Sequence, residues 1–418
     1  MSRMWDKGDP LDTRVLQYTA GEDHQLDNRL VAYDVRATIA HARMLAAGEL
    51  LDAAHLEAIE SGLTEIAESH ARGDWQISLE EEDVHNALEH RLSLQAPQAA
   101  ARMHLGRSRN DQVLAALRLY LKDTARKLHD GAQRVAAELE ALGEREADTP
   151  LPGYTHLQPA MPSSVTLWAT GFAAELRDDA EGLLAAARRA DRNPLGSAAG
   201  YGAPGLPLDR EHTRRGLDFA TVHEPVTAVQ LSRGKAEAQM VFEIHLLMQD
   251  LGRLAADLIL FCSQEFSYVA LPSSMTTGSS IMPQKRNPDV FELVRARAAT
   301  TLGCLNEALA VPAKLTSGYH RDLQLLKPPL FRAIDLAEAT LDIIAHALPE
   351  VDFMPDNIRM EEQLYATQDA YKLVTEEGLS FRDAYRQVGQ KLNALRSSAA
   401  SAKKPSAQPP GDTGKKEG

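Results

Sequence analysis

The stretch Leu114–Leu142, LAALRLYLKDTARKLHDGAQRVAAELEAL, decides the fold of this chain of 418 residues. Leucine, alanine and valine side chains recur at steps of three and four residues throughout it. This spacing places them on one face of an α-helix. Because the pattern persists over so many turns, it predicts a long helix that packs at a shallow angle against others, as in a bundle.

Two further segments carry the same pattern. Met240–Phe261 repeats it with large apolar side chains, and Val165–Arg188 is rich in Ala and Leu with charges interleaved. Strand signals are sparse: the chain has no series of segments in which apolar and polar residues alternate and which are joined by hairpin turns. The sequence therefore predicts an all-α, long-helix bundle, whose many alanines allow helices to approach closely within one chain or between subunits.

We expect four parts along the chain. Residues 1–105 form a helical N-terminal domain, residues 106–350 form the long-helix bundle, and residues 351–396 form a small helical C-terminal domain. Residues 397–418 consist largely of Ser, Ala, Lys, Pro and Gly without apolar periodicity. That composition predicts a disordered tail.

Charge and composition exclude several classes of partner. The formal net charge of −14 argues against non-specific binding to nucleic acid and to anionic membrane surfaces. Met1–Pro10 is polar, and no apolar run is long enough to span a bilayer. Cys262 and Cys304 lie outside any Cys-x-x-Cys pattern, which favours buried free thiols in a reducing compartment. We therefore expect a cytoplasmic protein with no nucleic-acid or membrane partner.

Two segments were candidates for a cofactor or metal site, and neither carries the required pattern. Gly196–Gly202 is glycine-rich, but no convincing strand precedes it and no acid for a ribose follows in the right context. His85–His90 lacks the spacing of metal ligands and is interpreted as a solvated helix. The sequence implies no metal and no organic cofactor.

The segment Gly278–Asp289, GSSIMPQKRNPD, combines glycine, paired hydroxyls and a lysine with a helix start. Asn287 is predicted to be the N-cap, Pro288 the first helical residue and Asp289 an acid in the first turn. Backbone N–H groups and the Lys285 ammonium suit this place to negative charge. A serine there could act as a base through its alkoxide if the loop closes over it; the alternative is a plain capped loop.

Three more polar segments flank the predicted long helices. His104–Gln112 sets two arginines around a serine, which suits carboxylates, although an N-cap with solvated arginines explains it equally well. Gly153–Gln158 holds a Thr-His pair in a loop, a credible proton-transfer site, although a lone histidine is more often structural. Tyr319–Lys327 is a polar strip at a helix start or a solvated surface face.

Taken together, these segments resemble the argininosuccinate lyase/δ-crystallin branch of the fumarase/aspartase superfamily. The three superfamily blocks occur in order at Gly106–Gln112, Gly153–Gln158 and Gly278–Asp289. The resemblance covers nearly everything from about Leu26 to Gly389. The last block marks only the superfamily, whereas the Gly-Arg-Ser-Arg-Asn-Asp-Gln run is selective for the argininosuccinate lyases.

The resemblance implies a carbon–nitrogen lyase (an amidine-lyase). Its members cleave argininosuccinate reversibly to arginine and fumarate by anti elimination, the last step of arginine biosynthesis. It also implies a homotetramer with a central twenty-helix bundle. Each active site would be shared, taking one of the three blocks from each of three subunits.

The match of motifs also implies a role for each catalytic residue. Ser279 is the base that takes the proton from the succinyl carbon, and Lys285 with the helix start stabilises the resulting charge. His156 serves the leaving guanidino nitrogen, directly or through water, and Glu292 orients it. Part of the acid role can lie in the substrate, because a guanidino group leaves well only when protonated. The positions expected to bind substrate are Ser108, Asn110, Thr155, Asn287, Tyr319, Gln324, Lys327, Arg107, Arg109 and Arg233.

The chain departs from the family pattern in several places. The family's Asp-Arg-Asp segment is Ser232-Arg233-Gly234 here, and Leu325 and Leu326 replace an acidic pair before Lys327. The altered positions are Leu105, Trp5–Gly8, Ser232, Gly234, Leu325, Leu326 and the shortened C-terminus after Gly389. They motivate two alternatives: a lyase for another N-succinyl or amino-acid adduct, and a helical scaffold that has lost catalysis.

Overall fold

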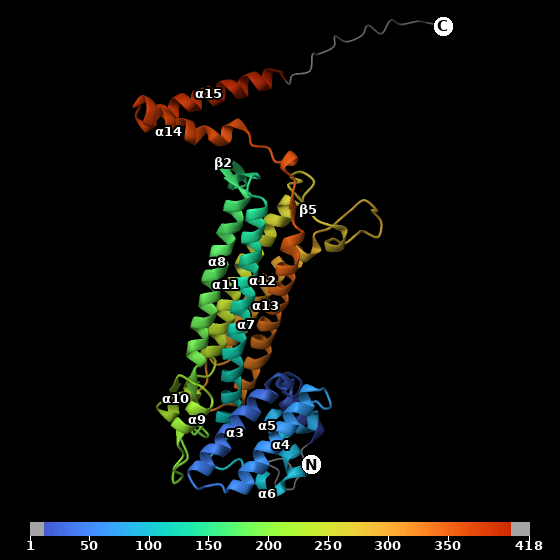
Figure 1. The fold of residues 1–418 in the computed structure, drawn as a ribbon, viewed down its shortest axis with the longest axis vertical. Helices are drawn as coiled ribbons and strands as arrows, with labels where there is room; N and C mark the ends of the chain where they lie inside the picture. Colours follow the sequence, from blue (N-terminus) through green and yellow to red (C-terminus); the bar gives the residue numbers. More distant parts are fainter. Residues whose placement is uncertain (1–11, 403–418) are drawn as a thin grey trace, which may run out of the picture.

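The computed structural model describes residues 12–402, and the side chains of residues 12–394. Long helices run side by side through the middle of the molecule, with smaller helical regions at both ends (Figure 1). The described strands are short and pair only two by two. The all-α prediction is confirmed.

Five long helices form the central bundle. The predicted seam lies in the first of them, where Leu128, Ala132, Val135 and Leu139 are fully buried. The third predicted segment, Val165–Arg188, is helical over nearly the same range. The five helices are α7 (Arg109–Arg145), α8 (Val165–Ala190), α11 (Lys235–Phe261), α12 (Asp289–Ala310) and α13 (Lys327–Ala347). Their apolar faces contribute most of one continuous core.

The N-terminal region packs around the start of α7. Its elements are α1 (Thr13–Ala20), α2 (Asp23–Leu26), the 3₁₀ turn η1 (Asp27–Leu30), α3 (Val31–Ala47), α4 (Ala53–Ala71), η2 (Leu79–Glu81), α5 (Val84–Gln95) and α6 (Pro97–Ala100). The predicted solvated helix at His85–His90 is wrong, because the first turn of α5 faces the protein interior and His85 is only 2% exposed.

Short strands and turns connect the long helices. The hairpin between α7 and α8 was not predicted; its strands are β1 (Pro150–Thr155) and β2 (Gln158–Ser164). The strands β3 (Arg192–Asn193) and β4 (Thr221–Val222) pair in parallel, and β5 (Val269–Ala270) pairs antiparallel with β6 (Asp352–Phe353). The remaining connecting elements are α9 (Arg210–Gly216), α10 (Val226–Leu231), η3 (Ser273–Met275), η4 (Arg321–Leu326), η5 (Leu348–Glu350) and η6 (Pro355–Asn357).

A helical hairpin ends the described chain. It follows the turn η7 (Glu362–Tyr365) and consists of α14 (Ala366–Glu377) and α15 (Phe381–Ala402). Ala370, Ala384 and Val388 form its own small core. Whereas we expected disorder from residue 397, α15 is helical to Ala402, and residues 403–418 lie outside the described residues. The division into domains at residues 105, 350 and 396 stays a prediction.

Two simpler expectations can be compared with the structure. Cys304 is buried and Cys262 is half-buried, and both are free thiols. Within residues 12–402, no helix is both long enough and apolar enough to cross a membrane.

Candidate active site

The Gly-Arg-Ser-Arg block forms the start of α7. Ser108 is the N-cap, its Oγ accepting from the Asn110 N–H at 3.3 Å, while Asp111 Oδ1 accepts from the Ser108 N–H at 3.0 Å. The other carboxylate oxygen of Asp111 accepts from the N–H groups of Gly196, at 3.1 Å, and Ala198, at 2.8 Å. The glycine-rich loop is therefore held against the first block, which gives it a structural role.

Neither arginine of this block is freely solvated, because Arg107 is buried and Arg109 is half-buried. Arg107 is buried and donates to Thr38 Oγ1 at 2.9 Å and to the Met103 carbonyl at 3.2 Å. Arg109 forms an ion pair with Asp83. Because the Arg107 guanidinium is engaged inside the N-terminal region, the geometry disfavours its predicted contact with substrate.

Arg109 opens onto a cavity of about 170 Å³ at this end of the bundle. Five separate segments of the chain supply its wall. Predicted substrate residues on that wall are Arg109, Asn110, Arg233, Tyr319, Gln324 and Lys327. The residues that sequence reasoning did not assign to the site are Ala20, Asp23, Glu82, Asp83, His85, Val113 and Arg321. The cavity carries charges of both signs.

Lys327 is a buried cation in the cavity wall that is paired with two carboxylates. It is 3% exposed, and its Nζ donates to Asp27 Oδ1 at 2.6 Å and to Asp23 Oδ2 at 3.1 Å. Burial opposes the charge, but the two carboxylates outweigh it and raise the pKa of Lys327. Burial also raises the pKa of Asp23 to about 7, although Lys327 acts in the opposite direction. The ammonium is therefore fixed as a cation.

Asp23 and Asp27 are the acidic partners of Lys327, although the residues directly before this lysine are Leu325 and Leu326. Leu326, at one of those two positions, is fully buried and packs in a small core beside the cavity. Gln324 joins the same two segments, donating to the Thr19 and Ala20 carbonyls at 3.1 Å each. A buried lysine requires acidic partners, so the acid-rich segment from Glu22 to Asp27 was the signal available in the sequence.

A second buried network lies behind the cavity wall. His85 forms an ion pair with Asp34, whose Oδ1 also accepts from Thr38 Oγ1 at 2.9 Å and from Gln112 Nε2 at 3.0 Å. Burial lowers the pKa of His85, but Asp34 outweighs it and the net effect raises that pKa. Burial likewise opposes ionisation of Asp83, yet Arg109 and His85 hold its pKa below the ordinary value. These contacts therefore favour the charged forms of His85 and Asp83.

The Thr-His pair lies at the tip of the hairpin between α7 and α8. His156 and Leu157 have φ of 55° and 57°, and Thr155 pairs with Gln158. Positive φ at both central residues defines a two-residue turn whose twist matches that of paired strands. We expected the Thr-His pair in a loop, and the structure places His156 at the exposed tip of a hairpin.

The signature segment is a loop closed at its base. Thr277 and Asn287 exchange two backbone hydrogen bonds, of 3.1 and 2.9 Å, and Thr277 Oγ1 donates to the Asp289 carboxylate. The predicted cap is one residue early: Pro288 is the N-cap and α12 begins at Asp289. The reason is that both backbone polar groups of Asn287 are already used in closing the loop.

Ser279 occupies a defined position within this loop. Its Oγ accepts from the N–H groups of Ile281, at 3.3 Å, and Met282, at 3.2 Å. Ser279 is half-buried, whereas Lys285 is exposed and Ile281 is 82% exposed. Two N–H donors on one hydroxyl oxygen stabilise negative charge on that oxygen. The arrangement suits a serine that loses its proton.

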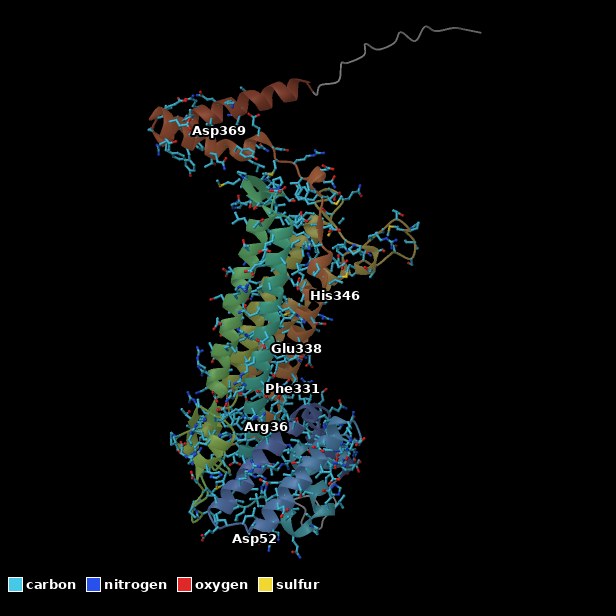
Figure 2. The ribbon with its side chains drawn as sticks, in the orientation of Figure 1. Arg36, Asp52, Phe331, Glu338, His346 and Asp369 are labelled. Carbon is cyan, nitrogen blue, oxygen red and sulfur yellow. The ribbon has the colours of Figure 1, made fainter. Side chains whose placement is uncertain are left out.

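Within one chain, the predicted catalytic residues do not line the cavity that holds most of the predicted substrate residues. At 1.5 Å per residue, the 37 residues of α7 span about 55 Å. The cavity lies at the starts of α5, α7 and α13, while the hairpin and the loop before α12 lie toward the other end of the bundle (Figure 1). Phe331, Glu338 and His346 mark the course of α13 between these ends (Figure 2).

The far end holds Ser279, Lys285, Glu292 and His156 together with two predicted substrate residues, Thr155 and Asn287. Glu292 is exposed on the first turn of α12. Among the described residues, no hydrogen bond or ion pair joins His156 to Glu292 or to Ser279. One chain thus offers a binding cavity at one end and exposed reactive groups at the other.

Comparison with known proteins gives a consistent result. A family model described as lyase matches residues 10–303. The chain is 45% identical over 404 residues to argininosuccinate lyase of Sorangium cellulosum, covering 96% of this chain and 93% of that protein. It is 38% identical over 391 residues to argininosuccinate lyase of Thermotoga neapolitana, covering 93% and 98%. A class II fumarase from Schistosoma mansoni has the same fold, with a TM-score of 0.76 at 18% identity over 93% of this chain and 91% of that chain.

Proposed function

This chain belongs to the argininosuccinate lyase family and is a carbon–nitrogen lyase, and we propose that it cleaves argininosuccinate to arginine and fumarate. The elimination is reversible and constitutes the last step of arginine biosynthesis. The observation that carries the proposal is the convergence of Arg109, Asn110, Tyr319, Gln324 and Lys327 on one cavity.

The charges of that cavity fit such a substrate. Argininosuccinate carries carboxylates, an α-amino group and a guanidinium, so its site needs both cations and acids. Arg109 and Lys327 supply fixed cations, and Asp23 and Asp83 supply acids beside them. Guanidinium and ammonium groups held in place by buried acids bind carboxylates without having to reorganise.

We assign the proton abstraction to Ser279. A C–H next to a carboxylate is a very weak acid, so its removal needs a strong base and a place for the resulting charge. The N–H groups of Ile281 and Met282 already point at Ser279 Oγ. The ammonium of Lys285, on the same loop, adds positive charge that stabilises both the alkoxide and the aci-carboxylate intermediate.

We assign to His156 the proton transfer at the leaving guanidino nitrogen, which takes place directly or through water. The tip of the β1–β2 hairpin is exposed and is therefore accessible to another copy, while its base is anchored. Tyr154 Oη and Tyr268 Oη share a hydrogen bond of 3.2 Å that fixes the hairpin to the segment before β5. Glu292, from α12, is the proposed carboxylate that orients the imidazole once subunits assemble.

We further propose a homotetramer in the cytoplasm, with active sites shared between subunits. Reactive groups at the opposite end of the long helices from the binding cavity can act on one substrate only if other copies supply them (Figure 1). The helices α8, α11 and α12 also leave large apolar side chains exposed, which favours association through their faces. These side chains are Leu167, Phe242, Leu246, Leu293, Leu302 and Leu309.

The direct test is an ultraviolet absorbance assay for fumarate. Purified protein mixed with argininosuccinate should release fumarate, while adenylosuccinate and aspartate should give none above background. If argininosuccinate were inert and either of the others yielded fumarate, the substrate assignment would be overturned. Inertness toward all three would favour a helical scaffold without catalysis.

A further inference from the structure

A second cavity, of about 320 Å³, lies between α7, α10 and the first turn of α11. Four basic residues line it: Arg118 on α7, Arg189 near the end of α8, Arg192 in β3 and Lys235 at the start of α11. Among its described lining residues, Glu237 is the only carboxylate. The wall thus carries four cations against one anion, and none of these residues takes part in the proposed elimination.

Arg118 at the base of this cavity has no acidic hydrogen-bond partner. It is 2% exposed, and its guanidinium donates to the Arg192 carbonyl at 2.6 Å and to Ser232 Oγ at 2.9 Å. Its third contact, His223 Nδ1 at 3.0 Å, is also neutral, because burial and Arg118 lower the pKa of His223 to about 4. Arg118 Nε has no partner in the part of the chain that the structure describes.

The one carboxylate nearby is shared with another cation. Glu237 lies 3.6 Å from Arg233 Nε, with which it forms a buried ion pair. Burial lowers the pKa of Arg118 to about 9, and Glu237 offsets that effect only in part. A buried guanidinium without a carboxylate of its own is rare, because removing such a charge from water is costly.

The start of α11 adds to the positive potential. This helix of 27 residues begins after Gly234, which has no side chain to cap it. The N–H groups of Ala236 and Glu237, both in the cavity wall, have no acceptor among the described residues. Unsatisfied N–H groups at the N-terminus of a long helix attract anions. Arg189, Arg192 and Lys235 are exposed at the rim.

We propose that this cavity binds a small polyvalent oxyanion, held between the Arg118 guanidinium and the first turn of α11. The anion supplies the negative charge that the buried arginine lacks in the protein, and it accepts from the free N–H groups. The volume suits an ion of the size of inorganic phosphate or a short dicarboxylate rather than a nucleotide. This site is separate from the cavity that binds the substrate.

The first test uses thermal unfolding of the full-length protein in inorganic phosphate and in chloride at matched ionic strength. Ser232→Asp places a carboxylate beside Arg118, so it should abolish the phosphate effect, and Ser232→Asn is the neutral control of nearly equal size. We expect a saturable rise in the unfolding temperature for the wild type and Ser232→Asn, and only the general salt effect for Ser232→Asp. An equal phosphate shift in all three proteins would overturn the proposal.

The second test measures the affinity of the full-length protein for phosphate by titration calorimetry. Arg192→Gln and Lys235→Gln alter exposed rim residues, so both should fold, and each should weaken phosphate binding about tenfold. A parallel titration with malonate distinguishes a phosphoryl ligand from a dicarboxylate by which of the two binds more tightly. Affinities unchanged in both variants would refute the site.

Discussion

The two ends of the bundle are built in different ways. At one end, Lys327 is buried between Asp23 and Asp27, and Arg109 is paired with Asp83. At the other end, His156 lies at an exposed hairpin tip, and Lys285 on its loop is also exposed. Within one chain, the charged groups of the proposed binding cavity are therefore buried and paired, whereas the proposed reactive groups at the other end lie near the surface.

The strongest test of this contrast is Ser279→Ala at the exposed end. We expect turnover to fall by about 10³-fold or more, because general bases contribute about 10²–10⁴-fold. Thermal stability and oligomeric state should not change, since Ser279 lies in a loop outside the core. Turnover is measured from fumarate release, and assembly by size-exclusion chromatography.

Ser280→Ala is the matched control, because Ser280 is the exposed neighbour on the same loop. It should keep most of the wild-type activity. If the two variants lost activity equally, the loop would matter for its conformation and not for a base at Ser279.

His156→Asn should lower turnover by about 10²-fold while leaving the assembled protein intact. Mixing this variant with Ser279→Ala should then restore part of the activity, because sites assembled from different subunits include some with both native residues. Activity is followed over hours of subunit exchange, and the exchange itself is monitored by native mass spectrometry.

Two outcomes would contradict this picture. Loss of assembly in His156→Asn would make the histidine structural. Absence of recovered activity despite demonstrated exchange would argue that each site lies within a single subunit.

At the buried end, Lys327→Met should act on stability as well as on activity. Removing the ammonium leaves Asp23 and Asp27 facing each other without a cation, and breaking a buried ion pair in this way costs about 3–5 kcal/mol. Chemical denaturation monitored by circular dichroism gives the free energy of unfolding. Lys285→Met is the matched control at the exposed end and should leave that free energy within about 0.5 kcal/mol.

The smallest expected effect is a pH dependence that comes from Asp23. Its pKa rises from 3.8 to about 7 on folding, so between these values the folded state binds more protons than the unfolded state. The contribution of Asp23 to stability therefore falls as pH rises through this window. At about 1.4 kcal/mol per pKa unit, the change from pH 5 to pH 7 is at most about 2–3 kcal/mol.

Asp23→Asn isolates this contribution, because the amide does not titrate. The difference in the free energy of unfolding, variant minus wild type, should be larger at pH 7 than at pH 5. Denaturation curves at both pH values measure the difference, and a constant difference would show that Asp23 stays ionised in the folded protein throughout.

Much of the bundle could be predicted from the sequence alone. The apolar period from Leu128 to Leu139 specifies a buried face whatever the neighbours are, because side-chain spacing along a helix is a local property. The N-cap at Ser108 is local for the same reason. The cap predicted at Asn287 was one residue early, because its backbone pairs with Thr277 across the loop, a contact that is not visible in the local sequence.

The same distinction between local sequence and tertiary packing applies to the candidate site. Local sequence patterns and the family resemblance identified the three blocks and the residue types suited to a base, a proton donor and carboxylate binding. Only the tertiary structure showed that Asp23 pairs with Lys327, that His85 is buried against Asp34, and that Arg107 is engaged in the protein interior. These residues come from distant parts of the chain, so their partners, burial and charge depend on how the long helices and the N-terminal region pack together.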